Sequence, residues 1–319
     1  MDALKLQNRA QQLLSKSTLE MSTEEWLVAR QAGIGGSDAS AVLGLNPFKS
    51  PLAVYNEKMD PNPQPTEPND KMRWGNILET PIAEHYAELN NVKIRRVNKI
   101  LQHKKEPWML GNLDRIITRP DGNTGVLEVK TAGGFYARTW ETEVPTYYYV
   151  QCQHYLAVTG YQWADIAVLI DGHDFRTHLV VRDEEFIEMM IENMRDFWEG
   201  NVLAGKEPEP TTAEDIKNLF PHATDGATAI ATPQIADVHK ALVEAKRRSK
   251  EAAEEVKAHE AQIKAFMGDA DTCLLDGHTL ATWKNVNSNR FDSKAFAVDH
   301  PELYAEYKRA SQSRRFLVK

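Results

Sequence analysis

The chain has almost no cysteine: only Cys152 and Cys273 occur among 319 residues, and they lie far apart in the sequence. Two isolated thiols cannot supply the ligands of a cysteine-held iron–sulfur cluster or of a zinc ribbon. So few cysteines are also typical of proteins that work in a reducing compartment. We therefore expect a cytosolic protein.

Long hydrophobic runs are missing as well. No apolar stretch approaches the roughly 20 residues that a membrane-spanning helix needs. Residues 1–17 lack the continuous apolar segment and the cleavage site of an export signal, and they predict an amphipathic helix instead. Hydrophobic residues still make up 42% of the chain, which is enough for a globular core in one large domain or two smaller ones, with no membrane partner.

Positive charge is scarce: 38 Lys and Arg face 46 Asp and Glu, so the formal net charge is −8. Proteins that bind nucleic acid are usually basic, because the release of counterions from phosphates supplies much of the affinity. The overall charge therefore argues against a nucleic-acid partner, unless the acidic residues gather at a metal site and on solvated helices. The basic segments 93–99, 104–105 and 308–315 are more typical of solvated surfaces than of DNA contacts.

The spacing of apolar residues predicts an α/β fold with a mixed central β-sheet flanked by helices. The expected helices cover residues 39–43, 70–89, 146–159 and 183–200, and the expected strands cover 92–101, 108–118, 124–130, 164–170 and 175–181. Residues 1–205 are therefore expected to form one domain. Residues 206–231, in which Pro and Thr are frequent, are expected to form a linker.

Residues 232–319 predict a C-terminal extension with a long helix and a small α+β unit. Pro233 is placed to start the helix, and apolar or small residues then recur three and four apart from Ile235 to Phe266. Such a heptad seam can dimerise, pack on the first domain or dock another protein; packing within the chain is its commonest use. The final elements are expected to be strands over 272–275, 279–285 and 315–318 and a helix over 301–307.

The turn signal at residues 119–123 joins two strands into a hairpin that carries the most informative residues. Asp114 lies near the end of the first arm. Glu128 and Lys130 lie two apart on the second arm and therefore project from the same face. Asp114 can then meet Glu128 across the ladder. An exposed strand face with charges placed for solubility would have the same spacing.

Two adjacent carboxylates repel each other unless a counter-charge lies between them. A hard divalent cation supplies that charge, and magnesium takes oxygen ligands from one or two carboxylates together with phosphate and water. One or two such ions can polarise a phosphodiester and activate water, while Lys130 orients the attacking water. We therefore expect Mg²⁺, or Mn²⁺ in its place, and cleavage of a phosphodiester.

Three further segments add polar candidates. Glu79 lies beside the apolar stripe of its helix and points at least partly inward; the alternative is a boundary glutamate paired with an arginine. Gln151 and Tyr155 lie one helical turn apart and can donate to a phosphate or to metal-bound water; the alternative is capping of a sheet edge. The glycine-rich segment 32–36 predicts a tight turn, after which Ser37 and Asp38 would cap the helix over 39–43.

Five motifs, in this order along the chain, resemble those of the YqaJ-type viral recombinase nucleases, relatives of phage lambda exonuclease within the PD-(D/E)xK superfamily. They are RxxGIGGSDAS at 30–40, RWGNxxE at 73–79, GNLD at 111–114, LEVKT at 127–131 and QCQHY at 151–155. The resemblance covers about residues 20–200. The proline that precedes the first aspartate in the superfamily is replaced by Leu113.

The resemblance implies a restriction-endonuclease-like nuclease core and gives each site residue a role. Asp114 and Glu128 would bind the metal directly, helped by the Val129 carbonyl. Glu79 would complete the site directly or through water, and Lys130 would position the attacking water. The helix residues that would support the site are Gln151 and, less directly, Gln153 and Tyr155.

The resemblance also implies a substrate, namely the ends of double-stranded DNA in the cytosol of a bacterium or of a phage-infected host. Arg30, Ser37 and backbone N–H groups near Gly36 would hold the terminal 5′-phosphate. The strand would be hydrolysed from 5′ to 3′, leaving 3′ overhangs for phage-type homologous recombination. Related enzymes are trimeric rings that thread the duplex, and a single-strand annealing protein is an expected partner. The alternatives are an endonuclease of the same fold and a non-catalytic DNA-binding scaffold.

Overall fold

The computed structural model describes residues 3–65, 67, 69–289, 291–309 and 314–318 and divides the chain into two compact units, Met1–Leu219 and Phe220–Lys319. Within the described residues, no helix combines the length and the apolar character that crossing a membrane requires. The first unit includes α9 (Ala213–Leu219), which lies inside the segment 206–231 expected to be a linker. Asp215 of α9 accepts a hydrogen bond from Ser50 Oγ at 2.5 Å.

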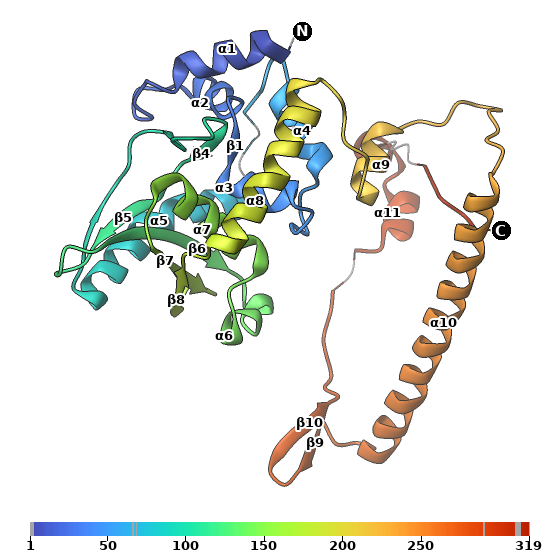
Figure 1. Cartoon of the computed structure of the whole chain (residues 1–319). Coiled ribbons are helices and arrows are strands. Elements are labelled where there is room, and N and C mark those ends of the chain that lie inside the picture. Colours follow the sequence, from blue (N-terminus) through green and yellow to red (C-terminus); the bar gives the residue numbers. More distant parts are fainter. Residues whose placement is uncertain (1–2, 66, 68, 290, 310–313, 319) are drawn as a thin grey trace. The chain divides into compact units, whose positions relative to one another are not determined.

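The first unit is built around a five-stranded sheet with the strand order β2-β5-β6-β7-β8 (Figure 1). Its strands are β2 (Lys93–Arg95), β5 (Arg115–Thr118), β6 (Thr124–Ala132), β7 (Trp163–Ile170) and β8 (Asp174–Val181). β6 and β7 run parallel, whereas the other neighbours are antiparallel. A parallel pair needs a crossover, which here contains the 3-10 turn η1 (Gly134–Tyr136), α6 (Thr139–Thr142) and α7 (Thr146–Thr159). The mixed sheet flanked by helices is thus confirmed.

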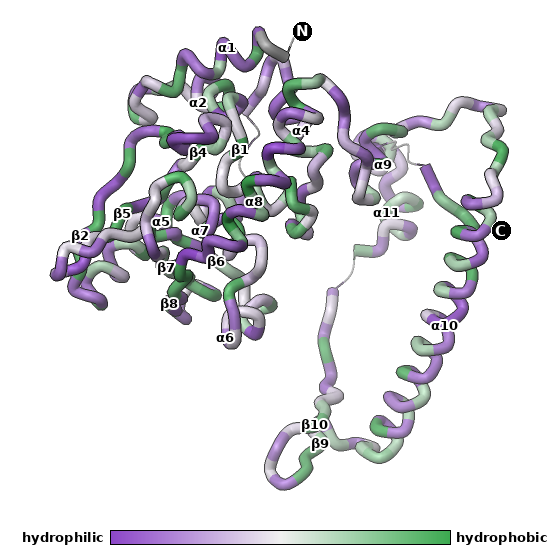
Figure 2. The backbone as a smooth tube through the Cα atoms, viewed as in Figure 1, coloured by the Kyte–Doolittle hydropathy of each residue, from purple (hydrophilic) through white to green (hydrophobic). Residues whose placement is uncertain are grey.

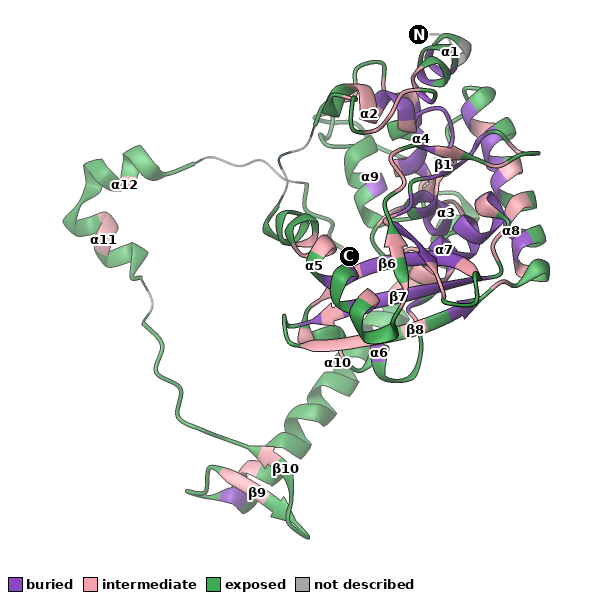
Figure 3. Ribbon diagram, turned by 90° about the vertical axis from the view of Figure 1, so that its left-hand side faces the viewer, coloured by how far each residue is buried: buried purple, intermediate pink, exposed green. Residues whose placement is uncertain are grey.

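Helices cover both faces of this sheet, and β6 and β7 are largely buried (Figure 3). On one face, α5 (Asp70–Asn90) packs against Leu127 and Val129 of β6. On the other face, α7 packs against alternate residues of the same strands. Because successive side chains of a strand point to opposite faces, Glu128 lies on the α7 side.

A second, three-stranded sheet has the order β1-β4-β3 and consists of β1 (Ile34–Gly35), β4 (Met109–Gly111) and β3 (Leu101–Gln102). Two predictions were therefore wrong, because each continuous strand expected over 92–101 and 108–118 is divided between the two sheets. The tight turn expected over 32–36 is also wrong, since part of it pairs with β4. A side chain at Gly33 would overlap the Trp108 backbone, so glycine permits this close approach.

The remaining helices of the first unit are α1 (Ala3–Leu13), α2 (Thr23–Arg30), α3 (Gly36–Val42), α4 (Pro51–Met59) and α8 (Glu184–Phe197), with a π-helical turn η2 at Trp198–Leu203. α3 begins earlier than expected, with Gly35 as its N-cap. The capping role predicted for Ser37 is therefore wrong. Asp38 accepts from the Gly35 N–H at 3.3 Å, but its carboxylate has other partners that are described below.

The second unit contains the long helix α10 (Pro233–Met267), along which apolar residues recur (Figure 2). A hairpin of β9 (Thr272–Leu275) and β10 (His278–Thr282) follows, and then α11 (Ser293–Asp299) and α12 (Pro301–Tyr307). The strand expected over 315–318 is wrong, because these described residues form no strand. A strand needs a neighbour to satisfy its backbone groups, which the sequence pattern of one segment cannot reveal.

Candidate active site

A cleft of about 250 Å³ in the first unit holds most of the residues that the sequence singled out. It is lined by Trp26, Arg30, Gly35, Gly36, Ser37, Ile100, Leu110, Asn112, Asp114, Glu128, Lys130, Gln151 and Tyr155. The cleft thus brings Asp114, Glu128 and Lys130 together with Arg30 and Ser37, which lie far away in the sequence.

Glu128 lies in the middle of β6 and is only 2% exposed. Its Oε1 accepts a hydrogen bond from Gln151 Nε2 at 2.6 Å and an ion-paired contact from the Lys130 ammonium. Its Oε2 is buried and has no hydrogen-bond partner within the described structure. A buried acceptor without a partner is costly, so this oxygen is suited to a ligand from outside the chain.

Asp114 reaches the same place through the register of the hairpin. Arg115 lies opposite Leu127 in the ladder, and Asp114 Oδ2 accepts from the Val129 N–H at 2.8 Å. Burial, together with the neighbouring Glu128 carboxylate, raises the pKa of Asp114 to about 8. Lys130 and the Val129 N–H oppose this rise only in part. The two acidic groups thus form a pair that a cation would stabilise.

Lys130 lies one pleat beyond Glu128. Burial lowers the pKa of the Lys130 ammonium, but the carboxylates of Glu128 and Asp114 raise it more, so the net shift is upward. The ammonium also lies 4.8 Å from the ring centroid of Tyr148. Lys130 therefore carries a positive charge at neutral pH beside the two carboxylates.

Glu79 does not line the cleft. Its Oε1 accepts from Arg115 Nη1 at 2.5 Å, and the same guanidinium donates to the Asp114 carbonyl at 2.6 Å. The structure thus places Glu79 in the arginine pair that was the alternative for this residue, one side chain away from the cleft. Among the described residues, no group of three or more His, Cys, Asp or Glu side chains is arranged to hold a metal. The carboxylates of Asp114 and Glu128 still match magnesium, which commonly uses one or two.

The residues of α7 divide between the cleft and the sheet edge. Gln151 donates to both Glu128 and the Tyr155 hydroxyl, the latter at 3.2 Å. Gly36 lies against the Tyr155 ring so closely that a side chain there would overlap the ring. Gln153 is fully buried away from the cleft, where it donates to the Val181 carbonyl at 2.8 Å. The sheet-edge alternative therefore applies to Gln153, not to Gln151 or Tyr155.

Arg30 and Ser37 form a cationic part of the cleft. Arg30 Nη2 donates to Ser37 Oγ at 3.4 Å, and the guanidinium lies 4.8 Å from the ring centroid of Trp26. Both side chains come from segments that flank β1, and they line the same cleft as Asp114 and Glu128. A guanidinium and a hydroxyl side by side are suited to hold a phosphate.

Asp38 lies beside Arg30 and is fully buried. Its carboxylate accepts from Lys58 Nζ at 2.7 Å and from Lys49 Nζ at 2.8 Å, and the Arg30 guanidinium lies 3.7 Å away. Lys58 Nζ also donates to the Arg30 carbonyl at 3.0 Å. Burial raises the pKa of Asp38, but the three cations lower it more, so the net pKa is well below the usual range. This network fixes Arg30 through both its backbone and its side chain.

Comparison with known proteins identifies the family. Residues 25–162 match the YqaJ-like viral recombinase domain. The uncharacterized protein YqaJ of Bacillus subtilis (strain 168) is 34% identical over 315 residues, which is 97% of this chain and 97% of that protein. This chain belongs to the YqaJ-like viral recombinase family. Every residue that lines the cleft falls within the matched segment.

Two solved structures are similar at lower identity. The alkaline exonuclease LHK-Exo of Laribacter hongkongensis is 21% identical, covers 57% of this chain and 94% of its own, and has a TM-score of 0.49. A phage-related exonuclease of Haemophilus somnus 129PT is 13% identical, covers 52% and 92%, and has a TM-score of 0.42. Both TM-scores lie below 0.5, so neither likeness adds to the assignment. Family membership and the group formed by Asp114, Glu128 and Lys130 together support a deoxyribonuclease as the enzyme class.

Sequence reasoning missed three cationic residues of this recombinase-family chain, Lys49, Lys58 and Arg115. For Lys58 a signal existed, because it follows the buried Val54 and Tyr55 at the spacing of one helix face. The sequence offers no such signal for Arg115, whose partners come from α5 and from the preceding residue.

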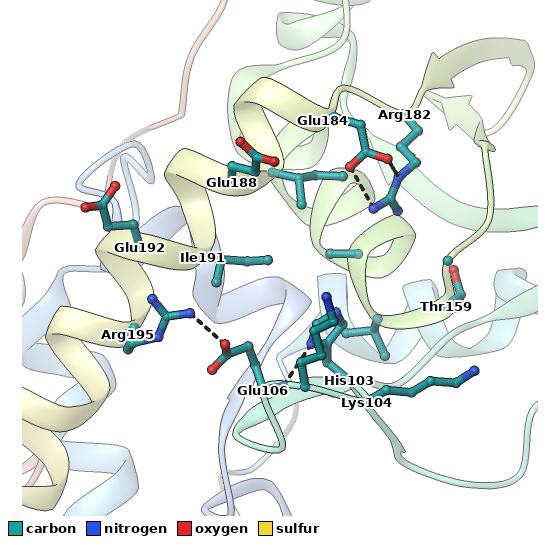
Figure 4. Close-up of a pocket in the computed structure, with 15 residues that line it drawn as sticks. His103, Lys104, Glu106, Thr159, Arg182, Glu184, Glu188, Ile191, Glu192 and Arg195 are labelled. Atoms are coloured by element: carbon teal, nitrogen blue, oxygen red, sulfur yellow. Dashed lines mark hydrogen bonds and ion pairs between the residues drawn. The ribbon is translucent and has the colours of Figure 1, made fainter.

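A second groove in the first unit, of about 600 Å³, is larger than the cleft but holds none of the predicted site residues. Figure 4 shows two ion pairs among the charged side chains that line it. Arg195 contacts Glu106 at 2.6 Å, and Arg182 contacts Glu184 at 2.6 Å. The smaller cleft is therefore the better candidate for catalysis.

Proposed function

We propose that this chain is a divalent-metal-dependent exonuclease that hydrolyses the 5′-phosphorylated strand of linear double-stranded DNA from 5′ to 3′. The 3′ overhangs that remain would serve homologous recombination of the phage type. One observation carries the proposal: a single cleft is lined both by Asp114, Glu128 and Lys130 and by Arg30 with Ser37.

The carboxylates of the cleft fit a divalent metal ion. Asp114 and Glu128 would hold the ion, and the partnerless Glu128 Oε2 and the raised pKa of Asp114 both support this role. A bound ion of this kind polarises the phosphodiester and makes water a stronger nucleophile. Lys130 orients the attacking water and offsets negative charge at the phosphorus. Gln151 holds the Glu128 carboxylate in place through its 2.6 Å hydrogen bond.

Arg30 and Ser37 would determine the direction of hydrolysis. We propose that Arg30 and Ser37, with the backbone around Gly36, hold the terminal 5′-phosphate while the next phosphodiester lies at the carboxylates. An enzyme that holds the 5′ end in this way acts from that end and moves towards the 3′ end. The buried Asp38–Lys58 pair keeps Arg30 in position.

Digestion of matched DNA substrates tests the proposal. Purified protein with Mg²⁺ should degrade a linear duplex with 5′-phosphates, should degrade the same duplex more slowly without them, and should leave a covalently closed circle intact. The release of mononucleotides from a 5′-labelled strand measures the direction. Cleavage of the circle would identify an endonuclease, and no cleavage of any substrate with Mg²⁺ or Mn²⁺ would contradict a nuclease altogether.

Assembly and partners are the remaining parts of this proposal. A trimeric ring around the duplex would hold DNA by enclosure, which reduces the need for a basic surface and agrees with a net charge of −8. A single-strand annealing protein would receive the 3′ overhang. The mass of the protein bound to a duplex end, measured by light scattering, tests the ring.

A further inference from the structure

α10 presents an apolar seam that the described residues of its own unit leave largely exposed. Helix α10 has 35 residues, so it is about 52 Å long. Its seam residues Ile235, Val238, Val256, Ile263 and Phe266 are between 46% and 82% exposed, and the helix is exposed along nearly its whole length (Figure 3). A seam of this length that stays in water is costly and suits a partner helix.

The order of large and small residues along the seam is almost the same from either end. Large residues lie at both ends, and small ones lie in the middle at Ala245, Ser249 and Ala252. We propose that α10 pairs with α10 of a second copy of this chain as an antiparallel two-stranded coiled coil. The midpoint then lies between Ser249 and Ala252.

In this register all ten seam residues form layers, each made of one residue and a different residue of the second copy. Five pairings each occur twice by symmetry, namely Ile235 with Phe266, Val238 with Ile263, Leu242 with His259, Ala245 with Val256 and Ser249 with Ala252. The small residues in the middle let the two helices approach closely, while large residues seal both ends. A parallel pair in register would instead place each residue opposite its own copy, including His259 opposite His259.

Charged residues beside the seam also favour the antiparallel arrangement. In the antiparallel pair, Arg248 faces Glu255 of the second copy, and symmetry produces this contact twice. His239 faces Glu260 in the same way. In a parallel pair, Glu255 would face Glu260 and Arg248 would face Ala253, so like charges would repel and the arginine would gain nothing.

Charge reversal in the full chain tests the pairing, with sedimentation equilibrium as the measurement of self-association. Arg248→Glu and Glu255→Arg should each weaken the association about tenfold, because each replaces two attractive contacts by two repulsive ones. The double variant should restore it. A parallel pair would behave differently: Glu255→Arg would strengthen it, and Arg248→Glu would leave it unchanged. Either of these results, or no response to any variant, would overturn the proposal.

Cross-linking gives an independent measurement. In a Cys273→Ser background, Ser249→Cys chains mixed with Ala252→Cys chains should form a disulfide-linked dimer on a denaturing gel, while either chain alone should not. The remaining thiol, Cys152, is buried. Cross-linking of each variant with itself would show a parallel pair. No cross-link in the mixture would show that α10 packs within its own chain or binds another protein. Each of these two results refutes the antiparallel pair, and the denaturing gel makes the test independent of any ring.

Discussion

Asp114, which lines the cleft, and Asp38, which is buried beside Arg30, have opposite electrostatic surroundings. The pKa of Asp38 is well below the usual range, because Lys58, Lys49 and Arg30 more than offset the effect of burial. The pKa of Asp114 is raised to about 8, because burial and the neighbouring Glu128 outweigh Lys130. The chain's own cations thus neutralise Asp38, whereas Asp114 remains short of positive charge.

This difference indicates different roles for the same type of side chain. Asp38 is a structural anchor whose partners are complete, so it needs nothing from outside the chain. The raised pKa of Asp114 and the partnerless Oε2 of Glu128 are features expected of metal ligands before the metal binds. The net charge around a carboxylate therefore separates an anchor from a candidate ligand more clearly than burial does.

The largest effect on activity should follow from a substitution of Glu128, the neighbour of Asp114. Glu128→Gln keeps the shape of the side chain but removes the charge, so we expect cleavage of linear duplex with Mg²⁺ to fall by about 10³-fold or more. Single-turnover digestion measures this. Glu184→Gln is the matched control, since Glu184 is exposed and pairs with Arg182 outside the cleft. Equal activity of both variants would contradict the assignment of Glu128.

A substitution in the ion pairs of Asp38 should lower the stability of the protein. Lys58→Met removes one partner of a buried ion pair, and we expect the free energy of unfolding to fall by about 3 to 5 kcal/mol. Urea denaturation followed by circular dichroism measures it. Lys49→Met is the control and should cost less, because Lys49 is 22% exposed. A loss below about 1 kcal/mol for Lys58→Met would show that Asp38 does not depend on this lysine.

His154 extends the comparison of Asp38 and Asp114 to a buried group that forms no ion pair with a described residue. His154 is fully buried, with Nε2 2.9 Å from the Leu110 carbonyl, and burial lowers the pKa of its imidazole from 6.5 to about 4. Between these values the unfolded chain binds a proton that the folded chain does not. Stability should therefore fall as the pH falls from 6.5 to 4, by about 3 kcal/mol from this residue.

Urea unfolding of the wild-type chain and of His154→Gln at several pH values isolates this contribution. The variant lacks the titrating imidazole, so its stability should fall less steeply over the same range. Parallel pH profiles of the two proteins would show that His154 is already charged in the folded chain.

The smallest effect should concern the DNA end. Arg30→Ala should reduce the preference for a 5′-phosphorylated duplex by about tenfold, because it removes a charge-assisted contact to phosphate. The ratio of initial rates with and without the 5′-phosphate measures this. Ser37→Ala should reduce the same ratio less. An unchanged ratio in Arg30→Ala would mean that the cationic part of the cleft does not bind the 5′-phosphate.

Much of the fold and part of the site could be predicted because they depend on local periodicity. The alternation of side chains along β6 placed Glu128 and Lys130 on one side, and the structure has them in contact. The one-turn spacing of Gln151 and Tyr155 placed both in the cleft. The helices α5, α7 and α10 and the strands β6, β7 and β8 likewise follow from spacing, which each segment carries within itself.

Only the tertiary structure decided which charges meet. Asp38 had the sequence of a helix cap, and it does accept from the Gly35 N–H. It is also a buried anchor, because Lys49 and Lys58 approach from α4 and the residues before it. Glu79 had the spacing of an inward ligand but pairs with Arg115 from another element. The sequence determines the faces of helices and strands, because those repeat over a few residues. The ion pairs depend on distant segments meeting, and their energies depend on burial that no single segment determines.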